Sequence, residues 1–207
     1  MNYVWDERIE YLFNTRKLMW NNNYMEFLIQ NVWKIDKTVD VIDFGYGIGF
    51  LASLLMPLLP SGSSYTGIDI GEDLIEKAKD IYRDCEFNIN FFQADLVEYV
   101  PSQQYDISIC QTFLGHVSEP METLGKMVKC LRPGGRVICI EPDGNIANAG
   151  VYIDGLERNE MCDLGTIQQY WINNQKKNNF DGCIGLKIPI YIHFSRNKCW
   201  HKNLNKT

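Results

Sequence analysis

A glycine-rich turn joins a short apolar strand to a helix, and this turn constrains the fold more than any other part of the chain. Asp40 to Phe44 is a short run with β-branched residues, and Gly45-Tyr46-Gly47-Ile48-Gly49 follows at its end. Phe50 to Leu59 then shows the apolar spacing of a helix. Glycines at such a point let the backbone turn sharply and pass close to a ligand. The turn therefore predicts a strand, a ligand-binding loop and a helix in succession.

The same strand and helix rhythm continues along the chain. Further strands are predicted at Ser64–Ile70, Asn88–Gln93, Asp106–Cys110 and Arg136–Glu141, the last after the turn Pro133-Gly134-Gly135. Helices are predicted at Glu72–Arg83 and Met121–Leu131. Alternation of this kind predicts an α/β fold, with a Rossmann-like, doubly wound and mostly parallel sheet that helices cover on both faces.

The two flanks of this core differ from it. Residues Glu7 to Trp33 have helical spacing with a break at Asn21-Asn22-Asn23, which predicts an N-terminal helical cap over residues 1–37. After Glu141 we expect one helix between about residues 155 and 175. Leu186–Phe194 is a candidate last strand, restricted by Pro189 to a sheet edge. At 207 residues the chain fits a single domain, with its core at residues 38–142.

Composition excludes several classes of protein. The chain is 45% apolar, which suffices for a core, and its net charge of −6 argues against a nucleic-acid partner. The seven cysteines form no CxxC pair and indicate reduced thiols rather than a disulfide or metal site. No targeting segment and no apolar run long enough for a membrane helix is expected, so the prediction is a cytoplasmic protein without a membrane partner.

Three acids lie at or just after the ends of the first three strands. Asp43 stands two places before the glycine turn, where a carboxylate suits a ligand of cationic character. Asp69 lies 24 residues after Gly45, close to the offset at which an acid meets ribose hydroxyls in such folds. Asp95 could accept a hydrogen bond from an adenine amino group. The alternatives stay open: Asp69 as a helix N-cap or solvated acid, and Asp95 as a turn residue.

Taken in order, five blocks of this sequence resemble the class I S-adenosylmethionine (SAM)-dependent methyltransferases. The blocks are Asp43 to Gly49, Asp69, Gln93-Ala94-Asp95, Tyr105-Asp106-Ile107 and Leu131 to Gly135. The resemblance implies SAM as the cofactor, with the following contacts: Gly45, Tyr46 and Gly47 at the methionine part, Asp69 and Ile70 at ribose and adenine, Asp95 and Leu96 at the adenine edge, and Gln111 and Thr112 near the sulfur. A dehydrogenase is disfavoured because Phe50 replaces the third glycine of its GxGxxG turn.

The methyl acceptor is expected at the same end of the sheet. His116 follows the fourth strand there and is the candidate general base, the alternative being a histidine that packs or caps the next helix. Aromatic and basic residues of the N-terminal cap are candidates for a lid: Trp5, Tyr11, Arg16 and Trp20. Their alternative is the buried stripe of an amphipathic helix. Residues 143–207 are expected on the acceptor side.

We therefore predict a SAM-dependent methyltransferase that acts on a small-molecule acceptor. The alternative is a related domain that binds SAM without turnover, or is truncated, because the last strands typical of the resembled family are not evident after Glu141. An incomplete sheet would expose an edge, over which the sequence allows a homodimer.

Overall fold

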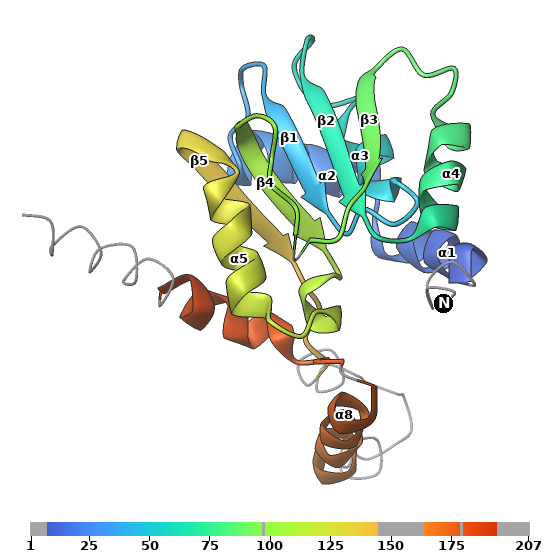
Figure 1. Ribbon diagram of the computed structural model, residues 1–207, viewed down its shortest axis with the longest axis vertical. Coiled ribbons are helices and arrows are strands. Elements are labelled where there is room, and N and C mark those ends of the chain that lie inside the picture. The colour runs from blue at the N-terminus through green and yellow to red at the C-terminus, as the bar shows by residue number, and fades with distance from the viewer. Residues whose placement is uncertain (1–7, 97, 145–163, 179, 194–207) are drawn as a thin grey trace, which may run out of the picture. The chain divides into compact units, whose positions relative to one another are not determined.

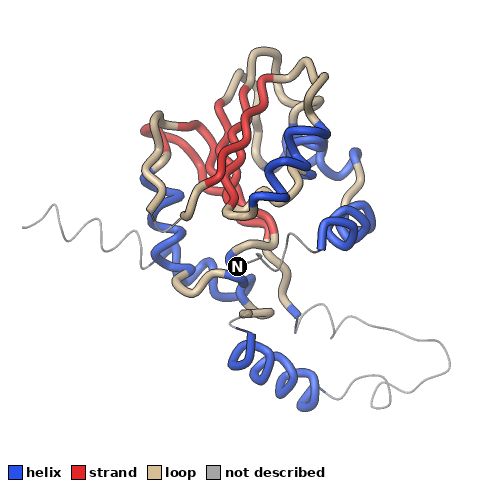
Figure 2. The backbone as a smooth tube through the Cα atoms, turned by 45° about the vertical axis from the view of Figure 1, so that its right-hand side comes forward, coloured by secondary structure: helices blue, strands red, loops and turns tan. Residues whose placement is uncertain are grey.

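Five strands form one twisted sheet in the computed structural model, in the order β3-β2-β1-β4-β5 (Figure 1; Figure 2). The structure describes residues 8–96, 98–144, 164–178 and 180–193. Its strands are β1 (Asp40–Phe44), β2 (Ser64–Asp69), β3 (Asn88–Gln93), β4 (Tyr105–Gln111) and β5 (Leu131–Ile140). The order places β1 at the centre, so that the glycine turn after β1 emerges from the middle of the sheet.

The registers show why the α/β prediction holds. β1 pairs in parallel with both β2 and β4, and β2 pairs in parallel with β3. Four of the five residues of β1 are buried, which is the pattern of a strand covered on both faces. The predicted Rossmann-like fold is confirmed, and the bounds of β1 and β3 match the sequence prediction residue for residue.

The helices begin and end close to the predicted positions. They are α1 (Ile9–Met19), α2 (Asn22–Phe27), the π-helix η2 (Leu28–Val32), α3 (Phe50–Leu55), α4 (Glu72–Ile81), the 3-10 helix η3 (Leu114–His116), α5 (Pro120–Lys129) and α8 (Leu164–Asn178). The predicted break at Asn21 is an N-cap, because the Tyr24 N–H donates to Asn21 Oδ1 at 2.8 Å. None of the described helices has the length and apolar character needed to cross a membrane.

Two compact units make up the chain. The first consists of Met1–Gln111 with Met127–Ile138, and the second of Thr112–Lys126 with Cys139–Thr207. The first unit holds the cap helices, the glycine turn, strands β1 to β4 and most of β5. The second holds η3 and the described C-terminal segments.

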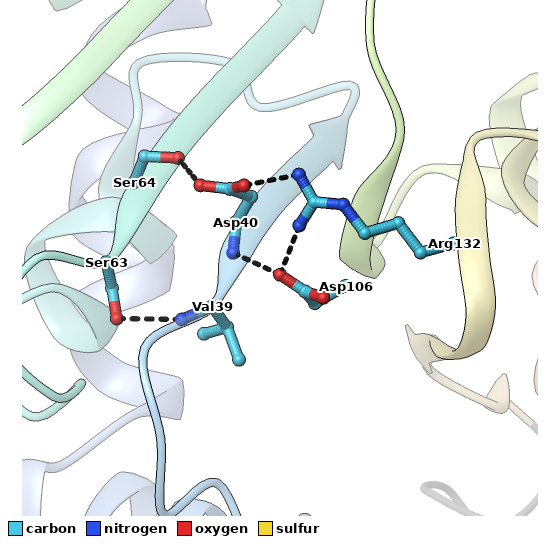
Figure 3. Close-up of polar contacts among 6 residues, drawn as sticks. All are labelled: Val39, Asp40, Ser63, Ser64, Asp106 and Arg132. Carbon is cyan, nitrogen blue, oxygen red and sulfur yellow. Dashed lines mark hydrogen bonds and ion pairs between the residues drawn. The ribbon is translucent and has the colours of Figure 1, made fainter.

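A polar network ties together the amino ends of several strands in the first unit (Figure 3). Arg132 at the start of β5 donates to Asp40 Oδ2 at 2.7 Å and to Asp106 Oδ2 at 2.6 Å. The Ser64 hydroxyl donates to Asp40 Oδ1, and the Asp40 N–H donates to Asp106 Oδ2. The Arg132 guanidinium therefore bridges carboxylates from β1 and β4 through two charge-assisted hydrogen bonds.

β5 begins earlier than the sequence indicates. The predicted turn Pro133-Gly134-Gly135 lies inside the strand, and Gly134 has a φ of +85°. The Tyr105 N–H donates to the Cys130 carbonyl at 2.8 Å, and Arg132 near the start of β5 forms an ion pair with Asp40 of β1. These long-range contacts hold the segment in the strand despite its turn-forming composition.

The predicted last strand at Leu186–Phe194 is wrong over its described part, because residues 184–193 are helical. Ile184 and Ile188, four residues apart, are the buried positions, which is helical and not strand spacing. The Cys183 N–H donates to Asp181 Oδ1 at the start of this helix. In the part of the chain that the structure describes, no strand follows β5, as expected for an altered sheet end.

Candidate functional site

The glycine turn after β1 requires a backbone that only glycine adopts easily. Gly45, Gly47 and Gly49 have φ values of +71°, +60° and +77°, all in the left-handed region. The Gly45 N–H donates to the Ile68 carbonyl at 2.9 Å, which joins the turn to β2. Gly49 then leads directly into α3. The three glycines are thus explained by backbone conformation, whatever the turn binds.

An aromatic cluster supports this turn from within the core. The Tyr46 ring packs on Phe91, with ring centroids 4.7 Å apart, and only 6% of Tyr46 is exposed. A Cβ at Gly67 would lie 2.7 Å from the Tyr46 ring, and a Cβ at Gly49 would lie 2.9 Å from Phe91. The Tyr46 side chain therefore fills the core, and its backbone is the part that remains on the turn.

Asp43 is a buried acid at the carboxyl end of β1. It is 1% exposed and accepts a hydrogen bond from the Tyr65 hydroxyl through Oδ2. Its other oxygen, Oδ1, has no hydrogen-bond partner among the described residues. Burial raises the pKa of Asp43 to about 8, against the lowering effect of the Tyr65 hydrogen bond; the nearby Asp69 raises it and Arg16 lowers it.

Asp69, at the end of β2, links the second strand to the glycine turn. Its Oδ2 accepts from the Gly47 N–H at 2.9 Å. Its Oδ1 accepts from the N–H groups of Ile70 and Gly71, at 2.7 Å and 3.1 Å. Three backbone donors thus fix the orientation of this carboxylate. The N-cap residue of α4 is Gly71 and not Asp69, so the bond of Asp69 to the Gly47 N–H connects it to the glycine turn instead.

The loop after β3 lies against the loop after β2. The Ala94 N–H donates to the Asp69 carbonyl at 2.9 Å, and the Gln93 side-chain amide donates to the Ile70 carbonyl at 3.2 Å. The Asp95 carbonyl accepts from the N–H groups of Glu98 and Tyr99, which closes a turn, while the residue itself is exposed. Both readings of Asp95 remain open, since an exposed turn residue can also reach a ligand.

The first unit thus brings together most of the predicted cofactor residues. Asp69 is bonded to the Gly47 N–H of the glycine turn and its charge acts on Asp43, Asp95 and Leu96 follow in the neighbouring loop, and Gln111 is buried at the end of β4. Of the predicted lid residues in this unit, Trp5 lies outside the described residues, Tyr11 is 57% exposed, and Arg16 and Trp20 are partly buried.

Thr112 and His116 belong to the second unit, in a segment held by a carboxylate. Glu141 accepts hydrogen bonds from the N–H groups of Phe113 and Leu114, each at 2.9 Å to Oε1. Thr112 has a φ of +49°, a strained value for a β-branched residue. The His116 ring stacks on Phe180 with centroids 4.5 Å apart, so the packing alternative for this histidine describes at least one of its contacts.

Two residues of these sites escaped the sequence analysis. Tyr65 reaches Asp43 only because β1 and β2 pair with Val41 opposite Tyr65, and such a register is not visible in one sequence. Glu141 was predicted only as the last residue of a strand, whereas β5 ends at Ile140. An acid directly after one strand, beside the segment that follows the neighbouring strand, is the signal that a topology prediction could have used.

The carboxyl groups beside the glycine turn fit SAM, the cofactor that the resemblance implies. The unpaired buried oxygen of Asp43 suits an ammonium or other cation, because a buried acceptor without a donor is unfavourable. A second carboxylate, that of Asp69 at the end of β2, accepts a hydrogen bond from the Gly47 N–H of the glycine turn. Two acids at this turn suit a cationic ligand with hydroxyl groups, whereas a pyrophosphate would meet like charge.

Comparison with known proteins agrees with this geometry. A family model described as "Methyltransferase domain" matches residues 35–196. Because this match covers more than three quarters of the chain, the chain belongs to that methyltransferase family. The predicted class I SAM-dependent methyltransferase family is therefore confirmed, and the cofactor of this family is SAM.

Individual relatives match over shorter stretches. A ubiquinone biosynthesis O-methyltransferase of Coxiella burnetii is 32% identical over 98 residues, which are 47% of this chain and 41% of the relative. The protein of the same name from Hydrogenovibrio crunogenus is 30% identical over 115 residues, 55% of this chain and 46% of the relative. The chain thus spans less than half the length of these curated relatives.

Solved structures share the fold at lower identity. The structure described as a DhpI-SAH complex superposes with a TM-score of 0.54 at 21% identity, covering 69% of this chain and 68% of that one. The methyltransferase complex with the Trm112 activator of Haloferax volcanii gives 0.53 at 18% identity, covering 70% and 64%. At these identities the likeness supports the Rossmann-like fold.

Proposed function

We propose that this chain catalyses transfer of a methyl group from SAM to a hydroxyl group of a small-molecule acceptor. The observation that carries the proposal is the glycine turn with its two acids: Asp69 is bonded to the Gly47 N–H, and Asp43 offers a buried oxygen without a donor. Family membership supports methyl transfer, and the names of the curated relatives support an oxygen acceptor.

Most of the residues that would hold the cofactor belong to the first unit. In this proposal the backbone of Gly45, Tyr46 and Gly47 contacts the methionine part, and Asp69 accepts from the ribose hydroxyls. Ile70, Asp95 and Leu96 surround the adenine, and Gln111 and Thr112 stand near the sulfur. Asp69 suits its role because its carboxylate is already fixed by three backbone donors, which lowers the entropy lost on binding.

Bound SAM would supply an electrophilic methyl group on a sulfonium. The chain itself would align the acceptor and remove the proton of its hydroxyl group, for which His116 is the candidate general base. The η3 turn that carries His116 is held by Glu141, and the His116 ring has a flat aromatic neighbour in Phe180. A fixed imidazole meets the positional requirement of a general base.

Calorimetric titration with SAM tests the cofactor site. We expect binding by the wild type and a loss of at least about 10-fold in affinity in Asp69→Ala, because hydrogen bonds to a charged group contribute about 1.5–3 kcal/mol. Asp73→Ala, an exposed acid in the first turn of α4, is the matched control. Absence of SAM binding by the folded wild type would contradict the proposal.

A screen of phenols and catechols, read out as formation of S-adenosylhomocysteine (SAH), tests the acceptor class. We expect turnover that falls in His116→Gln without loss of SAM binding. Binding of SAM without turnover on any acceptor would favour the alternative of a binding domain. The cytoplasmic location, the single domain and the homodimer remain predictions.

A further inference from the structure

A segment close to the C-terminus, residues 180–185, packs on the η3 turn. The Asp181 N–H donates to the Gly115 carbonyl at 2.7 Å, and the Gly144 N–H donates to the Gly182 carbonyl at 2.8 Å. These two bonds join the segment to η3 and to the residues that follow β5. All of them lie within the second unit, which also holds the candidate base His116.

Two glycines make this contact unusually close. A Cβ on Gly115 would lie 2.7 Å from the Asp181 carbonyl oxygen and 3.3 Å from the Phe180 ring. A Cβ on Gly185 would lie 3.0 Å from the Glu141 carbonyl oxygen. Backbone atoms cannot move aside as the end of a flexible side chain can, so a side chain at position 115 would push the two backbones apart. The place of Phe180 is therefore fixed by backbone contacts.

Phe180 is the side chain that this packing brings to His116. The two rings stack with centroids 4.5 Å apart and planes 29° apart, and both residues are partly buried. Turning the imidazole out of its plane would break the contact between the rings, so the stack restricts its rotation. The backbone of His116 is held as well, because its N–H donates to the Phe113 carbonyl at 2.9 Å.

The orientation of this imidazole matters for the proposed reaction. There, His116 takes the proton of the acceptor hydroxyl while the acceptor oxygen bonds to the methyl carbon and the carbon–sulfur bond breaks. A general base acts only within about 2.6–3.2 Å of its partner atom, and a misplacement of about 1 Å can lower a rate about 100-fold. Stacking contacts the face of the imidazole, whereas proton transfer uses the nitrogens at its edge, so the two are compatible.

We propose that Phe180 is a positioning residue for methyl transfer: the segment 180–185, bonded to η3, holds the Phe180 ring on the imidazole of His116 and fixes the plane of the general base. This inference rests on the proposed function, since it requires His116 to act as the base. It gives the C-terminal segment a catalytic task in place of the strand that the sequence predicted there.

Steady-state kinetics with an acceptor from the screen above gives the first test. We expect Phe180→Leu to lower kcat about 10-fold and to leave the dissociation constant of SAM within about 2-fold of the wild type. Phe180→Tyr retains a ring and should keep kcat within about 2-fold. Phe87→Leu makes the same change at a residue that is 45% exposed in the first unit, and should have no effect on either quantity.

A double-mutant cycle separates positioning from general support of the fold. If Phe180 acts through His116, its substitution has nothing left to misplace once the imidazole is gone. Phe180→Leu should therefore change kcat by less than about 2-fold in a His116→Gln background, although it lowers kcat about 10-fold in the wild type. Gly115→Ala should lower kcat in the wild-type background as Phe180→Leu does, because the added Cβ displaces the segment.

Proton NMR measures the stack without any acceptor. The chain has only three histidines, and His116→Gln assigns the imidazole signals of His116. The Phe180 ring current should shift these signals, and the shift should disappear in Phe180→Leu and persist in Phe180→Tyr. Thermal unfolding of each variant checks that the fold is retained.

Each remaining outcome overturns a defined statement. Imidazole signals that do not change in Phe180→Leu, or an equal loss of kcat with and without His116, would overturn the inference and leave the proposed function intact. Unchanged kcat in His116→Gln would remove the general base from the proposed function, and the inference with it. A wild type that binds no SAM, or methylates no acceptor, would overturn the proposed function itself together with the inference.

Discussion

At the scale of single residues, Asp43 shows how burial changes the chemistry of an ordinary acid. The group is almost fully buried, one oxygen is bonded to Tyr65, and the other has no donor in the described structure. Burial outweighs the Tyr65 hydrogen bond and raises the pKa to about 8, so the carboxyl is mostly protonated at neutral pH in the free protein. Its charge state is therefore expected to respond to a cationic ligand.

Cofactor binding at pH 7 should release protons. A cation brought to Oδ1 favours the carboxylate and lowers the pKa of Asp43 from about 8, so up to about one proton leaves per bound SAM. Titration in buffers of different ionisation enthalpy measures this number from the slope of the observed enthalpy. Asp43→Asn should remove the proton release, and an unchanged slope in that variant would assign the protons to another group.

The same acid affects stability with a defined sign. Its pKa in the folded protein lies above the ordinary value of 3.8, so its contribution to stability is full below that value and is lost as the pH rises through about 8. Asp43→Asn should therefore flatten the decrease in the free energy of unfolding between about pH 4 and pH 9. Urea unfolding at several pH values measures this. A steeper decrease in the variant would contradict it.

At the scale of elements, close approach between strands and the glycine turn decides where side chains can be added. Gly67 in β2 leaves room for the Tyr46 ring, whereas Gly125 in α5 has no heavy atom within 4 Å of its Cβ position. Packing therefore requires glycine at position 67, whereas Gly125 only lowers the helix propensity of α5.

Two alanine substitutions test this contrast. Gly67→Ala should destabilise the protein by about 1–3 kcal/mol, because the added methyl group overlaps the Tyr46 ring and must displace it. It should also weaken SAM binding, since Tyr46 belongs to the glycine turn. Gly125→Ala should stabilise by up to about 1 kcal/mol through helix propensity. Chemical denaturation measures both, and destabilisation by Gly125→Ala would show a constraint that the packing does not reveal.

A side chain just beyond β5, that of Glu141, accepts from two N–H groups at the start of the η3 turn. Glu141→Gln removes the charge that accepts from the Phe113 and Leu114 N–H groups, so we expect a loss of about 1–2 kcal/mol in stability. If His116 acts as the base, kcat falls about 10-fold while the dissociation constant of SAM, set by the first unit, changes little. Glu122→Gln in the first turn of α5 is the control. A changed SAM affinity with unchanged kcat would contradict this division.

At the scale of the whole molecule, the network around Arg132 connects segments that are distant in sequence. β1, β4 and β5 meet at one guanidinium, and the hydroxyl of Ser64 brings in β2. The side chains of Arg132, Asp40 and Asp106 are roughly one third exposed, so solvent screens their ion pairs. The network is therefore expected to favour this strand order while contributing only modestly to the free energy of unfolding.

Acid and salt should weaken this network. The Ser64 hydrogen bond and the Arg132 charge hold the pKa of Asp40 below its usual range, so its contribution to stability is present above pH 3.8 and is lost as the pH falls through its folded-state pKa. Arg132→Ala should destabilise by about 1 kcal/mol at neutral pH and low salt, and by less in 1 M salt. Arg83→Ala, at an exposed ion pair in the first unit, should have a smaller effect. Equal losses would show that the network adds nothing.

Local signals in the sequence determined most of the sheet. β-branched runs between turn residues located β1 and β3 to the residue, and the glycine turn predicted a ligand loop that the positive φ values explain. The spacing from Gly45 predicted Asp69 as a site residue, and its carboxylate accepts from the Gly47 N–H of the glycine turn. These features depend on contacts between near neighbours in the chain.

Long-range packing decided the rest. A turn sequence became the start of β5 because Arg132 is held by two other strands, and an apolar run after residue 184 became a helix because Ile184 and Ile188 are buried on one side. Tyr65 reached Asp43 through a strand register, and Leu12 of α1 was brought to the glycine turn by its packing against Ile48 and Leu74. Each depends on which distant segment lies alongside, and pairwise contacts of that kind are not encoded in any local pattern of residues.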